Sequence, residues 1–306
     1  MKLRIATRTS DLALWQARYV QQQLLLQDPN LTVELVPLKT QGDKILAVSL
    51  AKIGGKGLFI KELENALLAQ QADLAVHSLK DMPVKLAAEF ELMSIGPRED
   101  PRDCLISYSH KTLAQLAPGA IIGTSSLRRQ LQVQRLRPDC KIDFLRGNVL
   151  TRLKKLQAGQ YDAIILATAG VKRLALEAHI SEYLAVDTFV PAVGQGTLAV
   201  QWLTQRQDLS ALLAPLVQYK TEICQQAERA MNLALGGSCQ VPVAGYAKLS
   251  QGQLTLVGRV GDPKTGLLLE AILSAPAAQA RELGQAVAKQ LIAQGAQSIL
   301  AQYQDA

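Results

Sequence analysis

Short apolar strands that end in polar residues and lead directly into amphipathic helices recur along much of this chain. Leu3 to Thr7 reads as the first such strand, and Ser10 is a suitable N-cap for a helix predicted over residues 11–26. A strand is predicted over residues 32–38, and further strand–helix units begin at Ala120, Lys141 and Asp162, the last with a helix over residues 171–178. Alternating strands and helices are typical of sheets covered by helices on both faces, so we predict an α/β fold with doubly wound domains.

Two stretches rich in glycine and proline divide this pattern. Residues 96–102 read as a linker, and residues 190–196 as a second crossing that returns the chain to the first lobe. Beyond residue 217 the order changes to a helix, three strands and a helix, which predicts a small α+β domain with a three-stranded antiparallel sheet. A chain of 306 residues is expected to form two or three domains. We predict three: residues 1–97 with 197–216, residues 98–196, and residues 217–306.

The composition limits the class of partner. The formal net charge is +7, which favours an anionic substrate, membrane or nucleic acid. Aromatic residues make up only 4%, which argues against a protein that stacks single-stranded bases on its rings. No apolar run approaches the roughly 18 residues of a membrane span, and charges interrupt any signal-peptide core near the N-terminus. The four cysteines and three histidines show no metal-site spacing. The cysteines show no disulfide framework either, which favours a reducing cytoplasm or plastid-like interior.

Cys239 is the cysteine with the most distinctive surroundings. Two glycines, Gly236 and Gly237, end a helix predicted over residues 221–235 and place Cys239 on a tight loop before a strand. Small neighbours leave a sulfur accessible. Free cysteines are nevertheless mostly small buried hydrophobes, so position alone favours neither a reactive nor a buried thiol.

A long stretch between two predicted elements has no regular pattern. It covers residues 39–59 and has three glycines among residues 54–57. A Walker phosphate loop is excluded, because Gly57 stands where Ser or Thr should follow the lysine. Long irregular loops in compact domains are usually functional or disordered, and we interpret this one as a mobile lid over the site.

Arginines gather where predicted strands end. In open α/β sheets ligands bind at this edge. Two of these arginines lie in the first turn of a helix, where a cation is disfavoured by roughly 0.3–1 kcal/mol and a bound anion would remove the conflict. A solvated basic face is the commoner reading of a single charge run. Five arginines at one edge favour a polycarboxylate or phosphate site: Arg8, Arg128, Arg129, Arg146 and Arg173.

Asp81 is the acid that the pattern places among these cations. It follows a strand predicted over residues 73–79, in a turn restricted by Pro83. Such an Asp is most often a turn-former or N-cap. In a functional role it would stabilise positive charge in a reaction intermediate.

Ordered segments along nearly the whole chain resemble the porphobilinogen deaminase (hydroxymethylbilane synthase) family. The most distinctive are His77-Ser78-Leu79-Lys80-Asp81-Met82-Pro83 and Gly123-Thr124-Ser125-Ser126-Leu127-Arg128-Arg129. One departure is local, because the family often has Glu-Gly-Gly before the cysteine and this chain has Gly-Gly-Ser. The other matching segments are residues 4–8, 14–16, 54–59, 98–103, 145–148, 191–196 and 239–242.

The resemblance implies two domains like those of periplasmic binding proteins and a third domain that carries the cysteine. It implies that Cys239 holds a dipyrromethane cofactor through a thioether, built from the enzyme's own substrate. The activity implied is a transferase of tetrapyrrole biosynthesis. It deaminates four porphobilinogen molecules, joins them head to tail on this primer and releases hydroxymethylbilane by hydrolysis.

The resemblance also assigns roles to single residues. Asp81 would be the catalytic acid. The other cofactor-binding positions would be Lys80, Ser126, Arg128, Arg129, Arg146, Gly147 and Cys239. The substrate-binding positions would be Arg8, Ser10, Lys56, Phe59, Arg146, Arg152, Arg173 and Gln195. No metal is implied, and a monomer that binds porphobilinogen but neither nucleic acid nor membrane is expected.

Two rival functions come from other classes. Two hinged lobes with an anion site could simply bind a small acid, which would leave Cys239 and the third domain unexplained. Alternatively, the basic helix predicted over residues 127–137 could bind nucleic acid, which a steep dependence of affinity on salt would reveal.

Overall fold

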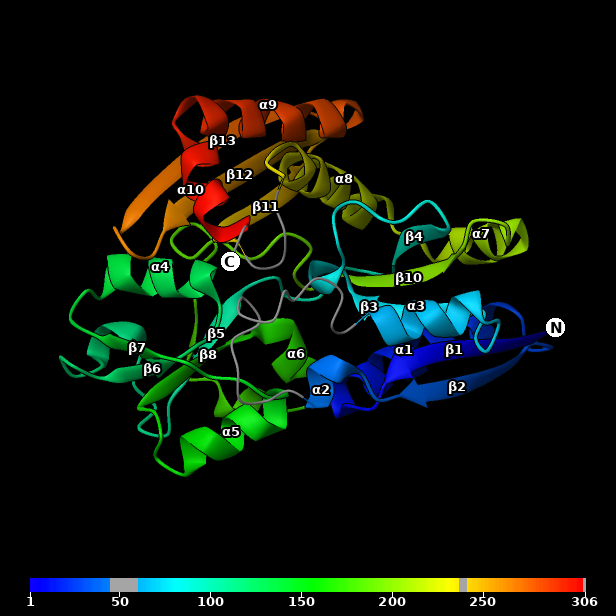
Figure 1. The fold of residues 1–306 in the computed structure, drawn as a ribbon, viewed down its shortest axis with the longest axis horizontal. Helices are drawn as coiled ribbons and strands as arrows, with labels where there is room; N and C mark the ends of the chain where they lie inside the picture. The colour runs from blue at the N-terminus through cyan, green and yellow to red at the C-terminus, as the bar shows by residue number, and fades with distance from the viewer. Residues whose placement is uncertain (45–59, 237–240, 305–306) are drawn as a thin grey trace.

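The computed structural model describes residues 1–44, 60–236 and 241–304, and these form three sheets (Figure 1). Residues 45–59 of the predicted lid, with Lys56 and Phe59, and the loop with Cys239 lie outside the described residues. The predicted fold class is confirmed: two mixed five-stranded sheets carry helices, and a three-stranded antiparallel sheet forms a third unit. No described helix has the length and apolarity needed to cross a membrane.

The first sheet has the strand order β2-β1-β3-β10-β4. β1 runs parallel to β2 and β3, whereas β10 is antiparallel to both of its neighbours. One face buries Leu24 of α1 and Leu209 of α7, and the other buries Leu63 and Leu67 of α3. The strands are β1 (Lys2–Arg8), β2 (Thr32–Leu38), β3 (Leu74–Ser78), β4 (Phe90–Ile95) and β10 (Leu198–Leu203). The helices are α1 (Asp11–Gln27), the short α2 (Gln41–Lys44), α3 (Lys61–Leu68) and α7 (Gln207–Leu213).

The second sheet has the order β7-β6-β8-β5-β9. Because side chains alternate across a strand, Leu105 of β5 packs toward α4 while its neighbour Cys104 packs toward α5 and α6. The strands are β5 (Asp103–Ile106), β6 (Ile121–Gly123), β7 (Lys141–Asp143), β8 (Ala163–Ala167) and β9 (Glu182–Tyr183). The helices are α4 (Leu127–Leu136), α5 (Val149–Gln157) and α6 (Thr168–Arg173).

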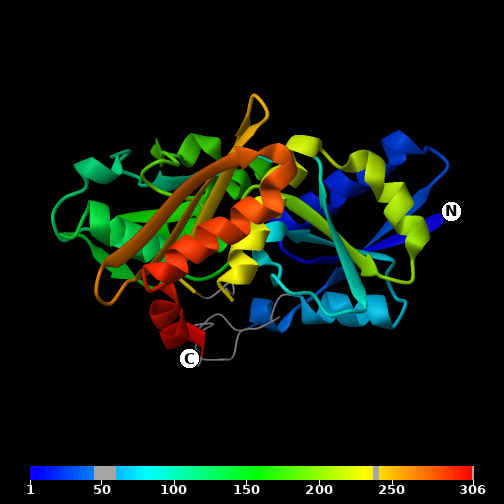
Figure 2. The same ribbon diagram turned by 90° about the horizontal axis from the view of Figure 1, so that it is seen from above.

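The third unit packs three helices on one antiparallel sheet, with a core that includes Met231, Leu256 and Val287. α8 and α9 lie very close, because Gly284 has no side chain. A Cβ at Gly284 would collide with the carbonyl oxygen of Ala227. Seen from above, α9 crosses the junction of the other two units (Figure 2). The elements are α8 (Tyr219–Ala234), β11 (Val243–Ser250), β12 (Gln253–Asp262), β13 (Leu267–Pro276), α9 (Ala280–Ala293) and α10 (Ala296–Gln304).

The structure adds elements that the sequence pattern did not predict: β5, β9, α7, α10 and the short α2, which lies in the stretch interpreted as an irregular lid. It also shifts one helix. A helix was predicted over residues 171–178, but α6 covers Thr168–Arg173, and Ala175 follows it with a left-handed φ of 54°. That conformation ends a helix, although it is uncommon for a residue with a side chain.

The two crossings between the first and second sheets lie side by side and are joined by hydrogen bonds. Glu99 N donates to Gly196 O at 3.2 Å, and Arg98 Nε donates to Gln195 O at 2.9 Å. β10 pairs with β3 and β4, so the chain does return to the first sheet after residue 196. The exact domain boundaries stay a prediction.

Glu228 of α8 ties these crossings to the third unit. Its side chain is fully buried and forms an ion pair with Arg98 at 2.5 Å. Gly194 N and Ala247 N each donate to the same carboxylate at 2.8 Å. One buried carboxylate thus holds one residue from each crossing and one from β11.

Candidate active site

A cleft of about 630 Å³ lies between the first and second sheets. Arg8 at the end of β1 and the 3₁₀ turn after β3 (η2, Leu79–Asp81) form one wall. The second sheet and its helices form the other. Asp81 is the one carboxylate among the described lining residues. The lining cations among the described residues are Arg8, Lys39, Lys80, Arg129, Arg146, Arg152 and Arg173.

Local capping positions several of these groups. Ser10 lines the cleft, and its hydroxyl accepts from Ala13 N at the start of α1 at 3.4 Å. Gly147 also lines the cleft, with a φ of +118° and no room for a Cβ, which would lie 2.7 Å from a Thr151 methyl. Its carbonyl oxygen accepts from Arg152 Nε at 2.8 Å, so this glycine turn holds a cleft arginine in place.

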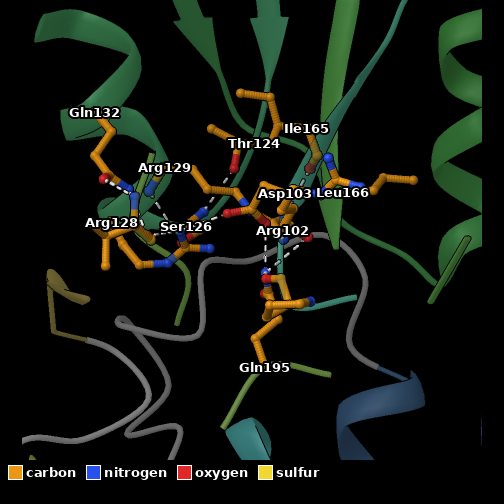
Figure 3. Close-up of polar contacts among 12 residues, drawn as sticks. Arg102, Asp103, Thr124, Ser126, Arg128, Arg129, Gln132, Ile165, Leu166 and Gln195 are labelled. Carbon is orange, nitrogen blue, oxygen red and sulfur yellow. Dashed lines mark hydrogen bonds and ion pairs between the residues drawn. The ribbon is translucent and has the colours of Figure 1, made fainter. Parts of the chain in front are cut away.

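Asp103, which the sequence analysis did not single out, joins Arg128 and Arg129 behind the cleft (Figure 3). Arg128 and Arg129 each approach one of its oxygens at 2.7 Å, and Asp103 is fully buried. Burial alone would raise the pKa of Asp103, but the two guanidiniums outweigh it and hold that pKa well below its usual range. The predicted anion site therefore already contains one internal anion.

Arg173 and Arg152 are cations even though the protein largely buries them. Burial lowers the pKa of Arg173 to about 10, and burial together with Arg129 and Arg146 lowers the pKa of Arg152 to about 10. Both remain protonated at neutral pH. Arg173 donates to Gly196 O at 2.7 Å, and its guanidinium lies 5.6 Å from the ring centroid of Trp15, a cation–π distance.

Comparison with known proteins identifies the family. Residues 3–211 match the family profile of the "Porphobilinogen deaminase, dipyromethane cofactor binding domain", and residues 222–293 match the "Porphobilinogen deaminase, C-terminal domain". A porphobilinogen deaminase from Chromobacterium violaceum is 51% identical over 300 residues, which is 98% of this chain and 97% of that protein. This chain belongs to the porphobilinogen deaminase family.

Solved structures with low sequence identity also resemble the chain. The BvgS VFT2 domain from Bordetella pertussis has a TM-score of 0.42 and 15% identity, over 69% of this chain and 84% of that one. The periplasmic aliphatic sulphonate binding protein SsuA from Escherichia coli has the same TM-score and identity, over 76% of this chain and 70% of that one. Likenesses this low do not bear on function.

The structure brings most of the family-derived residues together. Ser126 and Arg128 line a second cavity of about 80 Å³, which shares Lys80 with the cleft and contains Val241. Gln195 is buried and lines neither cavity, so its side chain is placed to support other residues. Lys56, Phe59 and Cys239 lie outside the described residues. The family-derived residues that do line the cleft are Arg8, Ser10, Lys80, Asp81, Arg129, Arg146, Gly147, Arg152 and Arg173.

Asp103 was missed because its role depends on residues distant in sequence. It stands at the end of Arg98-Glu99-Asp100-Pro101-Arg102-Asp103, a segment that matches the family. The sequence carried no local signal for this role, because the burial of Asp103 and of the strand that it opens is visible only in the structure. A buried acid needs a buried cation as partner, and the pattern of charges alone does not say which arginines provide it.

Lys80 should make binding of an anionic ligand depend on pH above neutrality. Burial lowers the pKa of Lys80 to about 8; Asp81 opposes this and Arg129 adds to it. The ammonium is present below that pH and is lost above it. We expect the affinity of the cofactor-free protein for a pyrrole tricarboxylate to fall between about pH 7 and 9, as measured by isothermal titration calorimetry. Lys80→Gln should bind more weakly at pH 7 and lose most of this pH dependence, and an unchanged profile in the variant would contradict the assignment.

Proposed function

We propose that this chain deaminates four porphobilinogen molecules, joins them head to tail on a covalent dipyrromethane primer, and releases hydroxymethylbilane by hydrolysis. This is the reaction of tetrapyrrole biosynthesis that its family performs. The observation that carries the proposal is the convergence of seven described cations from both mixed sheets on one cleft that also contains Asp81.

The residues of the cleft fit the cofactor. Porphobilinogen carries acetate and propionate side chains, so a primer built from it and a chain growing on it are polyanions. Guanidinium groups bind carboxylates through paired N–H donors, and they do so most strongly where water is excluded. When bound, dipyrromethane supplies the free α-carbon to which the next pyrrole is joined.

We assign the thioether to Cys239. Its described neighbour Val241 lines the small cavity together with Arg128 and Lys80. A cofactor attached nearby would therefore reach the cations that the resemblance assigns to it. Arg129 and Arg146 line the adjoining cleft, and we assign them to the carboxylates of the same group.

Asp81 is the residue to which we assign acid–base chemistry. Its carboxylate can accept hydrogen bonds from pyrrole N–H groups and stabilise the positive charge that develops as ammonia leaves. The same carboxylate would then assist loss of the proton from the α-carbon after two rings are joined. We assign Arg8, Ser10, Arg152 and Arg173 to the carboxylates of the incoming substrate.

We further propose that the chain acts as a monomer in the cytoplasm, without nucleic acid or membrane. The rival nucleic-acid function required α4 to present a basic face. Arg128 and Arg129 of that helix are instead 5% and 6% exposed and are paired with Asp103. Their burial favours a small-molecule site over a surface for a polyanion backbone.

The intact mass of the purified protein tests the proposal. We expect a mass increase of one dipyrrole that neither hydroxylamine nor reducing agents remove, and colour with acidic Ehrlich reagent. Cys239→Ser should fold but lack the added mass. Cys224→Ser, which changes a buried thiol of α8, should keep it. A wild-type chain of the translated mass, even after incubation with porphobilinogen, would overturn the proposal.

A further inference from the structure

Asp103 collects the hydrogen bonds of two arginines. Arg129 donates to Oδ1 through Nε at 3.0 Å and through NH2 at 2.7 Å, and Arg128 donates to Oδ2 through NH1 at 2.7 Å. Backbone carbonyl oxygens complete this arrangement, since Arg128 also donates to Val190 O and Arg129 to Ile165 O. Figure 3 shows Arg128 and Arg129 to the left of Asp103, with Gln195 below it.

Gln195 extends the network to the opposite wall of the cleft. Its Nε2 donates to Asp103 Oδ1 at 3.1 Å and to Pro101 O at 2.8 Å. Its Oε1 accepts from Lys80 Nζ at 3.3 Å. Lys80 follows a strand of the first sheet, whereas Arg128 and Arg129 lie in α4, which packs on the second sheet. One carboxylate therefore orients three cations from both sides of the cleft, two directly and one through an amide.

This arrangement orients the cations without neutralising the site. Arg128 and Arg129 share the carboxylate of Asp103, and Lys80 reaches it only through Gln195, so the pair of arginines keeps an excess of positive charge for an anionic ligand. A guanidinium has five N–H donors in a rigid plane. Holding one edge of that plane from behind determines where its other donors point, and Arg128 and Arg129 each line a cavity.

We propose that Asp103 is a positioning residue for the cations that receive the cofactor, and that it acts on Lys80 through Gln195. The inference rests on the proposed function. The inference goes beyond that function because it gives Asp103, which lines neither cavity, a role in cofactor loading rather than in stability alone.

Loading of cofactor-free protein tests this role. The protein would be produced in cells unable to make porphobilinogen and incubated with increasing porphobilinogen. The concentration that half-loads the folded chain would be read from intact mass. We expect Asp103→Asn to raise this concentration about 10-fold or more, since hydrogen bonds between charged groups are lost from both arginines. Circular dichroism would establish that the molecules compared are folded.

Two further variants make the test decisive. Asp100→Asn changes the same residue type in the same crossing, where Asp100 pairs with Arg102 at 2.6 Å, and should leave half-loading unchanged. If Asp103→Asn does not fold, Gln195→Met takes its place in the test. This substitution interrupts the connection to Lys80 without removing the buried carboxylate. It should raise the half-loading concentration about threefold.

The outcomes separate the two claims. Equal half-loading of wild type and folded Asp103→Asn would overturn the positioning role and leave the proposed function intact. If Asp103→Asn does not fold, equal half-loading of Gln195→Met would overturn it. A wild-type chain that gains no mass from porphobilinogen would overturn the proposed function, and the positioning role with it.

Discussion

Asp81→Asn is expected to bind substrate and cofactor but to lose about 100- to 10,000-fold in turnover. Asparagine keeps the shape and one oxygen of the side chain, so hydrogen bonds to pyrrole N–H groups can persist. It loses the negative charge, and Asp81 is the one carboxylate among the described residues that line a cleft rich in arginine and lysine. Positive charge developing on the substrate would then have no described lining carboxylate to stabilise it.

The measurement is a single-turnover experiment on cofactor-loaded protein. Intact mass before the reaction would establish that the variant carries its cofactor, and quenched samples would follow the addition of each pyrrole. Asp143→Asn, at an exposed strand end, is the matched control and should retain normal turnover. Unchanged kinetics in Asp81→Asn would refute the charge-stabilising role.

Glu228→Ala is expected to lower the free energy of unfolding by about 3–5 kcal/mol. The substitution leaves the Arg98 guanidinium, whose side chain is 11% exposed, without its carboxylate partner. It also removes the acceptor for Gly194 N and Ala247 N. Because this one side chain joins both crossings to the third unit, the effect should extend to all three sheets.

Urea unfolding of the cofactor-free variants measures this effect. Glu34→Ala breaks the exposed pair with Lys2 and should cost less than about 1 kcal/mol. Replacing Arg98 and Glu228 together by leucine should recover part of the loss, because no buried charge then lacks a partner. A Glu228→Ala variant as stable as Glu34→Ala would show that the buried pair does not hold the units together.

Sequence reasoning succeeded where the signal was local. Ser10 caps α1, as predicted, because a hydroxyl at that position meets the first free N–H groups of the helix it precedes. The strand Thr32–Leu38 is as predicted, and so are the hairpins of the third unit, because alternation of side chains is visible within each strand. The arginines at strand ends were also visible in the sequence, and four of these five line one cleft: Arg8, Arg129, Arg146 and Arg173.

Some elements had no such local signal. β5 begins at Asp103, directly after a linker with two prolines, where a polar residue reads as more linker. α10 is a short helix that follows α9 after Gly295, and its buried residues include Ile299 and Leu300. Their burial against the third sheet comes from packing between distant segments, which a window along one segment does not contain.

The sequence by itself determined the alternation of elements, the capping groups, the strand ends that carry arginine, and the family. Only the tertiary structure decided which charges meet. Asp103 lies 25 residues before Arg128, and Glu228 lies 130 residues after Arg98. An ion pair has no sequence period, because it depends on where packing places two side chains, so buried carboxylates that organise the cations become visible only in the folded chain.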